Sequence, residues 1–221
     1  MKNLKSFMCG LCALIMGSFA TPVIAGSSDF AGPYIAIQGS VNGGAMEGTA
    51  TNSNNEITSG SIGKVFGGVG LQVGWAVPVA DSFLIGLDLQ LNPGDGKMSL
   101  DSGQGDSEGN NEDITVEFGD IKRASITPMV SVSDSSAVYI KYGITLADLT
   151  WTGDVDTSLN SSMHGETIAV GSRTMYGTGM FIQTEAGVTD WDNLNVLAAS
   201  GGTAEASPKS VYGAVSVGFR F

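Results

Sequence analysis

The chain has 221 residues and carries 22 acidic against 10 basic side chains, which gives a net charge of −12 at pH 7. So acidic a protein would be repelled by a phosphate backbone, which argues against nucleic acid as a partner. Its two cysteines, Cys9 and Cys12, both lie near the amino terminus. The rest of the chain is therefore stabilised by neither disulfides nor cysteine-bound metal.

Residues 1–25 have the pattern of a secretory signal peptide. Lys2 and Lys5 supply the positive start, and an apolar run follows from residue 7 to residue 19. About thirteen apolar residues are too few for a membrane-spanning helix, which requires roughly twenty. We expect cleavage at the small residues that follow, leaving residues 26–221 as one domain. The net charge then changes from −12 to −14, because two lysines and no acid are lost.

Beyond the signal, apolar and polar residues alternate with the period of two that is typical of β-strands. The clearest example runs from Phe83 to Leu91, where alternate positions are apolar while Asp88 and Gln90 lie on the opposite face. The sequence predicts eight strands, at residues 32–41, 62–77, 83–91, 114–132, 138–146, 166–178, 181–191 and 210–221.

Short and long connections alternate between these strands. Short turns are expected at 78–82, 133–136 and 177–180, and long polar loops at 42–60, 92–113, 152–164 and 197–209. Short turns on one side and long loops on the other predict an all-β fold, an eight-stranded antiparallel up-and-down transmembrane β-barrel. A closed sheet of this kind satisfies every backbone polar group in lipid.

A soluble lipocalin-like barrel or a β-sandwich would show the same alternation, with the apolar face turned inward. In a membrane barrel the polar face points into the lumen, where Lys141 and Arg220 can pair with Asp88 and Glu185. We favour the membrane barrel and expect an interior polar network of Gln72, Asp88, Gln90, Lys141, Gln183, Glu185 and Arg220.

Aromatic residues at the predicted strand ends favour the same fold. Trp75 lies at a short-turn end, while Trp151 and Trp191 lie at long-loop ends. Two aromatic girdles, one at each membrane interface, would require that distribution.

The final strand ends on Phe219-Arg220-Phe221, and its closing aromatic residue resembles the assembly signal of bacterial outer-membrane barrels. Ser216 stands where that signal usually has a glycine. With the signal peptide, eight amphipathic strands and acidic loops, the chain resembles the small outer-membrane barrel superfamily that includes OmpA and OmpX. The resemblance implies an outer membrane of the Gram-negative type, lipid and lipopolysaccharide as neighbours, and recognition of Phe219 and Phe221 by the barrel-assembly machinery.

Candidate sites for chemistry are few. The only histidine, His164, has no spacing that forces a base and its orienting carboxylate together, so we expect no enzyme. The stretch 101–112 is acidic at both ends like a calcium-binding loop, but Gly103, Gly105 and Asp106 do not match the pattern. We therefore expect no metal site and no cofactor.

Because side chains alternate between the two faces of a strand, Lys122 is expected on the lipid-facing side, near the outer headgroups. It is therefore a candidate to bind an anionic lipid phosphate. We expect a monomer with a structural or surface-interaction role, which displays acidic loops outward. A narrow, porin-like channel for small solutes is the first alternative. An outer-membrane lipid-modifying enzyme is the second, and it would depend on His164.

Overall fold

The computed structural model describes residues 27–51, 57–93, 96–100, 114–152, 160–197 and 203–221. The expected signal peptide lies outside these ranges. No helix within them is long and apolar enough to cross a membrane. The elements are η1 (Ser27–Phe30), β1 (Gly32–Thr51), β2 (Ile57–Ala80), β3 (Phe83–Asn92), β4 (Gly96–Leu100), β5 (Ile114–Ser133), β6 (Ser136–Thr152), β7 (Asn160–Tyr176), β8 (Met180–Trp191), β9 (Leu194–Leu197) and β10 (Thr203–Arg220).

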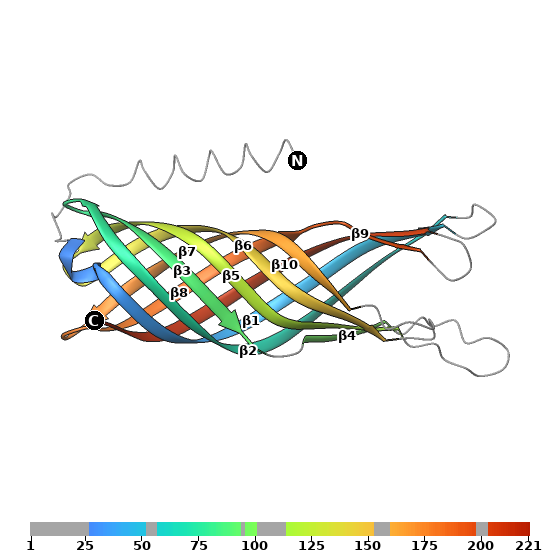
Figure 1. The fold of residues 1–221 in the computed structure, drawn as a ribbon, viewed down its shortest axis with the longest axis horizontal. Coiled ribbons are helices and arrows are strands. Elements are labelled where there is room, and N and C mark those ends of the chain that lie inside the picture. Colours follow the sequence, from blue (N-terminus) through green and yellow to red (C-terminus); the bar gives the residue numbers. More distant parts are fainter. Residues whose placement is uncertain (1–26, 52–56, 94–95, 101–113, 153–159, 198–202) are drawn as a thin grey trace.

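Eight of the ten strands close a ring. Each pairs antiparallel with the next in the order β1, β2, β3, β5, β6, β7, β8 and β10, and β10 then pairs with β1. The closing ladder runs from Tyr34↔Arg220 to Thr51↔Thr203. The short strands β4 and β9 pair with β5 and β10 near one end of the ring (Figure 1). The predicted eight-stranded antiparallel up-and-down barrel is thus confirmed.

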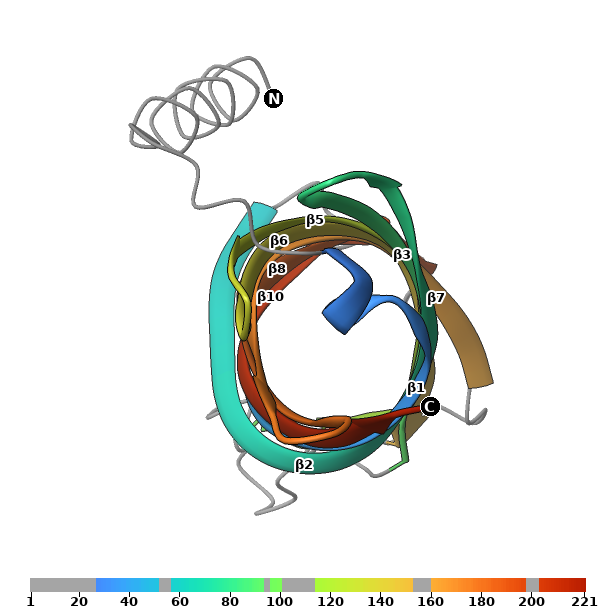
Figure 2. The same ribbon diagram turned by 90° about the vertical axis from the view of Figure 1, so that its left-hand side faces the viewer.

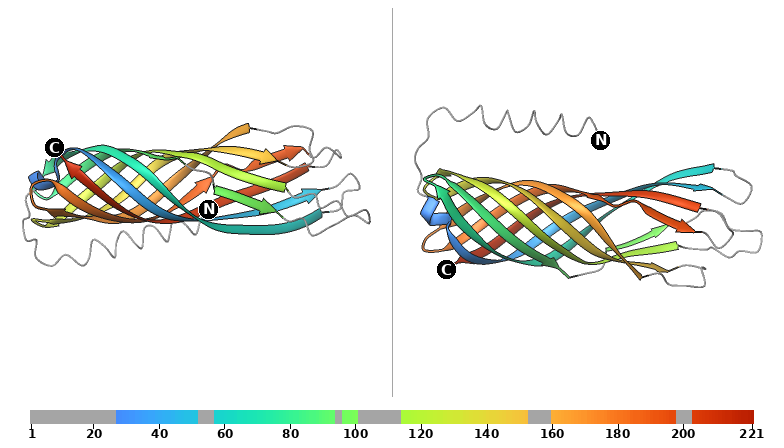
Figure 3. Two further views of the ribbon diagram at one scale, coloured as in Figure 1. Left: turned by 90° about the horizontal axis from the view of Figure 1, so that it is seen from below. Right: turned by 45° about the horizontal axis from the view of Figure 1, so that its top comes forward.

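The two ends of the barrel differ. At the turn end, two-residue turns at Asp81–Ser82 and Asp134–Ser135 and a three-residue turn at Gly177–Gly179 join neighbouring strands. The carboxyl terminus lies there, and η1 sits inside the ring of strands (Figure 2). At the opposite, hairpin end, the strands extend as two paired groups (Figure 3). One group is β9, β10, β1 and β2, and the other is β4, β5, β6 and β7.

The predicted strand limits were too short at the hairpin end. The expected loop 42–60 is largely strand, because β1 and β2 stay paired up to Thr51↔Ile57. β4 lies within the expected loop 92–113, and β7 begins at Asn160 rather than 166. These extensions are rich in Gly, Ser and Thr, so they lack the apolar alternation by which lipid-facing strands are recognised. A backbone ladder needs no such alternation.

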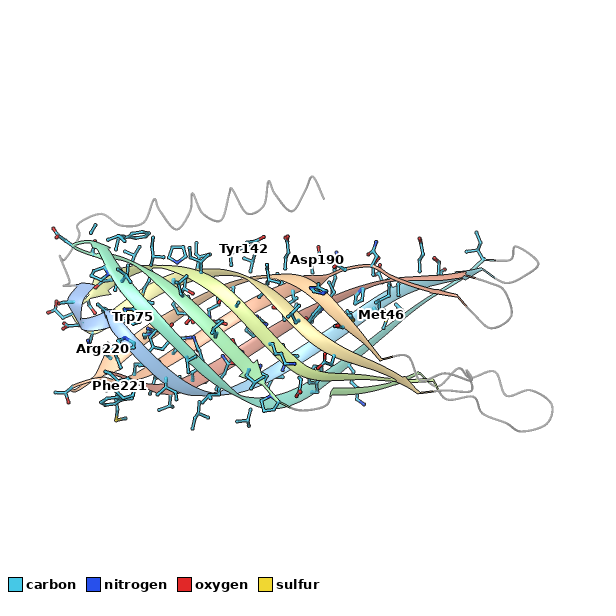
Figure 4. The ribbon with its side chains drawn as sticks, viewed as in Figure 1. Met46, Trp75, Tyr142, Asp190, Arg220 and Phe221 are labelled. Atoms are coloured by element: carbon cyan, nitrogen blue, oxygen red, sulfur yellow. The ribbon has the colours of Figure 1, made fainter. Side chains whose placement is uncertain are left out.

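The outer surface of the barrel is apolar and the lumen is polar. Leu87 and Leu89 are 62% and 61% exposed on the outside, whereas Asp88 and Lys141 are 3% and 1% exposed. Side chains project outward along the whole wall, Tyr142 and Asp190 among them (Figure 4). A continuous apolar outer surface is unfavourable in water and suits a lipid bilayer. The soluble alternative, with the apolar face inward, is excluded.

A polar collar limits the apolar band toward the hairpin end. Along β1 the outward residues are apolar up to Val41, and Glu47 follows beyond two small residues. On β10 the last apolar outward residue is Val211, and Lys209 follows. We define the polar collar as the outward residues Glu47, Lys122, Asp148, Glu166, Asp190 and Lys209. Its position marks where a bilayer's hydrocarbon region ends.

Candidate functional site

The lumen is filled in three layers. An apolar cluster closes the turn end and is made of Phe30, Tyr34, Ala36, Ala76, Leu84, Met129, Ala137, Tyr139, Met175 and Phe181. A second apolar cluster, of Met46, Ala147, Met163 and Trp191, occupies the hairpin end. Between them lies a polar layer. An eight-stranded barrel is just wide enough for such side chains to fill it.

Asp88 on β3 is one of two carboxylates buried in the polar layer. Gln72 Nε2 donates a hydrogen bond to Asp88 Oδ1 at 2.8 Å. The hydroxyls of Tyr34 and Thr127 also donate to this carboxylate. Three donors from β1, β2 and β5 therefore surround one acceptor, as burial of a charged group requires.

Glu185 on β8 is the second buried carboxylate and is bound more completely. Lys141 Nζ lies 2.5 Å from Glu185 Oε2. The Tyr139 hydroxyl donates to the same oxygen at 2.8 Å, and the Tyr212 hydroxyl donates to Oε1 at 2.6 Å. The charge of Glu185 thus meets a cation and two neutral donors from β6 and β10.

Two glycines make room for these tyrosines. A Cβ placed on Gly171 would lie 2.3 Å from the Tyr139 ring, and one on Gly187 would lie 2.6 Å from the Tyr212 ring. Only a residue without a side chain leaves space for each ring to cross the lumen. The glycines of β7 and β8 therefore set the position of the donors to Glu185.

Arg173 on β7 connects the carboxylates to the aromatic cluster. Its guanidinium stacks on Tyr34 at 4.0 Å and on Phe181 at 4.6 Å. Its Nη2 donates to Gln183 Oε1 at 2.8 Å, and Gln183 Nε2 donates to Gln72 Oε1 at 3.3 Å. The guanidinium of Arg173 therefore lies next to Tyr34, whose hydroxyl donates a hydrogen bond to Asp88.

Arg123 on β5 occupies the hairpin side of the polar layer and has weaker partners. Its Nε donates to Thr145 Oγ1 at 3.0 Å, and its Nη1 donates to Gln90 Oε1 at 3.4 Å. The guanidinium lies 4.4 Å from the centre of the Tyr212 ring. Among the described side chains it forms no salt bridge.

The buried charges do not cancel. The described lumen holds three buried cations, Arg123, Lys141 and Arg173, against two carboxylates, Asp88 and Glu185. Donors are also in excess, because Gln38 Nε2 is buried among the described side chains without an acceptor. The hairpin side of the polar layer thus carries positive charge inside a strongly acidic protein.

The sequence-predicted interior residues lie in this lumen with one difference. Gln72, Asp88, Gln90, Lys141, Gln183 and Glu185 are all buried there. Arg220 lies instead at the turn end and is only half-buried, and its Nη1 donates to the Ala31 carbonyl at 2.8 Å. As the last residue of β10 it is too close to the barrel's end to reach either carboxylate, so the suggested pairing of Arg220 is wrong.

Arg173 lies within the predicted strand 166–178 but is absent from the expected interior network. The alternation of side chains along the strand could have identified it. Val170 faces outward, so Ala169, Gly171 and Arg173 lie on the inward face. The same rule finds Thr167, whose hydroxyl bridges those of Thr145 and Thr189 at 2.6 and 2.8 Å.

Trp191 does not belong to an outer girdle, contrary to expectation. It is 8% exposed, and its Nε1 donates to Ser210 Oγ at 3.0 Å. On β8 it shares the parity of Glu185 and therefore points inward, and Gly165 on the neighbouring strand leaves space for its ring. Trp75 is exposed on the outside as expected, and the side chain of Trp151 lies outside the described residues.

The other singled-out residues lie on the outer surface. Lys122 is exposed in the polar collar, and its Nζ lies 3.5 Å from Asp148 Oδ2. His164 is exposed on β7. Phe219 and Phe221 face outward at the turn end, with ring centres 5.4 Å apart in an edge-to-face contact. The acidic stretch 101–112 lies outside the described residues.

Comparisons with known proteins give likeness in fold alone. No family model matches the chain, and no curated protein matches it in sequence. Among solved structures it is similar to Ail, the attachment invasion locus protein of Yersinia pestis, with 9% identity over 82% of this chain and 98% of Ail, at a TM-score of 0.42. Neisserial surface protein A is 10% identical over 83% and 97%, at 0.41. The outer membrane protease OmpT of Escherichia coli is 8% identical over 86% and 97%, at 0.48.

Proposed function

We propose that this protein is an integral outer-membrane barrel whose role is structural and interactive rather than conductive. The observation that carries the proposal is the filled lumen, which is closed by an apolar cluster at each end and by a bonded polar layer between them. A wall of this kind anchors extracellular hairpins in the membrane and leaves no wide path for solutes.

Orientation follows from the two ends. In transmembrane barrels short turns face the periplasm and long connections face outward, so the hairpin end is the extracellular one. That end is acidic: seven described carboxylates oppose three lysines there. They are Glu47, Asp120, Asp148, Glu166, Asp190, Asp192 and Glu205 against Lys64, Lys122 and Lys209. Its partners would therefore be cationic surfaces, or anionic ones bridged by divalent cations.

Neighbours in the membrane follow from the collar and the terminus. Lys122, held beside Asp148 at the outer boundary of the apolar band, would contact a lipid or lipopolysaccharide phosphate. The outward Phe219 and Phe221 would be read by the assembly machinery before membrane insertion. Replacing Lys122 by Glu should reduce lipopolysaccharide co-purification. Unchanged co-purification would remove that contact from the proposal.

Conductance separates this role from the channel alternative. The purified, refolded protein should give no steady single-channel current in planar bilayers, while an unheated sample migrates differently from a boiled one in a detergent gel. Regular current steps from the folded form would contradict the proposal. Loss of a lipid-modifying activity on replacing His164 would instead favour the enzyme.

A further inference from the structure

The barrel wall is incompletely paired near the polar collar. The ladder between β2 and β3 begins only at Leu71, although β2 stays paired with β1 as far as Ile57. β3 ends at Asn92, and the next strand, β4, pairs with β5 instead. β4 lies beside the β2 edge from 57 to 70 but forms no ladder with it, so within the described residues this edge has no backbone pairing on that side.

The facing strand is irregular at the same level. The register of β5 against β6 shifts between Gly119 and Lys122, and Asp120 adopts a left-handed backbone with φ of 42°. Such a bulge re-aims the neighbouring side chain, and Ile121 packs inward against the hairpin-end cluster. We call the space between Phe66 of β2 and Ile121 of β5 the side opening.

Two hollows meet at the side opening. A small inner cavity of about 30 Å³ is lined by Arg123, Trp191 and Tyr212, and a wider outer hollow of about 740 Å³ is lined by Gly39, Gly67 and Gly213. Both are also lined by Asn42, Phe66 and Ile121. The outer hollow forms where these glycines leave the wall without side chains.

The chemistry of the two hollows differs. Among the described side chains only Lys141 of the three buried cations forms a salt bridge, so Arg123, like Arg173, has no paired carboxylate. A buried unpaired charge is costly, so an anion at this position is favoured. The outer hollow opens among Val41, Val69 and Val215, within the apolar band and just below the polar collar. An occupant must therefore be anionic at its inner end and apolar along its outer part.

Size restricts the anionic group further. A water-sized atom requires roughly 10–15 Å³ of such volume, so a cavity of about 30 Å³ holds about two. The two oxygens of a carboxylate fit that space, and a guanidinium matches their geometry. A sugar-phosphate headgroup is too large.

We propose that the side opening is a binding site for a single-chain fatty-acid-type carboxylate. Its carboxylate meets Arg123 in the inner cavity, and its alkyl chain passes between Phe66 and Ile121 into the outer hollow and the bilayer. The site exchanges its occupant with the membrane through the wall, so the lumen itself stays closed.

Quenching of Trp191 fluorescence tests the site. The full barrel, with Trp75→Phe and Trp151→Phe so that Trp191 is the sole tryptophan, is reconstituted in phosphatidylcholine vesicles and titrated with 2-bromohexadecanoate, whose bromine lies next to the carboxylate. Trp191 is shielded from bulk lipid inside the wall, so saturable quenching reports occupancy of the inner cavity. The methyl ester, which lacks the charge, and bromoacetate, which lacks the chain, should not quench saturably.

Substitutions complete the test. Arg123→Gln should weaken quenching by about tenfold or more, and Arg220→Gln, which removes a cation at the opposite, turn end of the barrel, should leave it unchanged. Equal quenching by the ester or by bromoacetate, or an unaffected Arg123→Gln, would overturn the proposal.

A second variant covers the case in which Arg123→Gln fails to fold, which gel migration before and after boiling reveals. A Cβ on Gly213 meets nothing within 4 Å, so Gly213→Leu is accommodated and fills the outer hollow. It should weaken the binding of 2-bromohexadecanoate severalfold while the barrel still folds. Undiminished binding would show that the chain does not occupy the hollow and would reject the site.

Discussion

The two sides of the polar layer solve the burial of charge in different ways. Around Glu185, a cation and two tyrosines satisfy one carboxylate. Around Arg123, the partners are neutral oxygens and an aromatic ring. The first arrangement pairs a buried carboxylate with a buried cation, whereas the second surrounds a buried cation with neutral groups alone. The polar side chains around Glu185 therefore stabilise the barrel, whereas the guanidinium of Arg123 is available to bind an anionic ligand.

The largest effect should come from breaking the arrangement around Glu185. Lys141→Met removes the cation from Glu185 and leaves a buried carboxylate without charge compensation, which costs about 3–5 kcal/mol of unfolding free energy. Urea unfolding of the refolded barrel, followed by tryptophan fluorescence, measures it. The double variant Lys141→Met/Glu185→Gln removes both charges and should recover part of the loss. A single variant as stable as the parent would refute the comparison.

Crowding the tyrosines of Glu185 should have the next largest effect. Gly171→Val places atoms within the Tyr139 ring's space and should cost about 1–3 kcal/mol, as overpacking does. Gly213→Val is the matched control, since its side chain meets only open space on the outer surface. Thermal unfolding should distinguish the two valine variants, and equal melting temperatures would argue against the glycine's packing role.

The arrangement around Arg123 should respond more weakly. Arg123→Gln strands no carboxylate among the described side chains and loses two hydrogen bonds, so a cost of about 1–2 kcal/mol is expected. Urea unfolding under the conditions used for Lys141→Met gives the comparison directly. A loss as large as that of Lys141→Met would mean that Arg123 is as structural as Lys141.

The smallest effect belongs to the polar collar. Lys122 and Asp148 are both more than half exposed, so Lys122→Gln should change the unfolding free energy by less than about 1 kcal/mol. The difference should shrink further in high salt, because exposed pairs are screened. Unfolding at two ionic strengths checks this, and a salt-independent loss would place the pair in a less solvated setting.

Sequence alternation predicted the wall well because lipid outside and a narrow lumen inside leave each strand residue one of two environments. Leu87, Asp88 and Leu89 show this directly. Beyond the polar collar water replaces lipid, the alternation fades, and the extended strands near Thr51 and Asn160 escaped prediction.

The candidate site was harder to predict, for geometric reasons. Parity places Arg123 and Trp191 in the lumen, but it says nothing of which strands fail to pair. The side opening depends on where β3 ends at Asn92 and where β5 bulges at Asp120. The dipeptide Pro93-Gly94 signals the end of β3, and the sequence places that end to within one residue, at 91. No local signal, however, shows that the next strand pairs with β5 and leaves the edge of β2 without a ladder.

The ladder that joins β1 to β10 has a kinetic consequence. Its partners are as distant in sequence as Tyr34 and Arg220, so the ring gains this row of backbone bonds only when its first and last strands meet. Until then the backbone N–H and C=O groups along two sheet edges have no hydrogen-bond partners. Such edges are unfavourable in lipid and can pair with the strands of other chains. Insertion should therefore be slow and cooperative, and it should favour a carrier that keeps both edges covered.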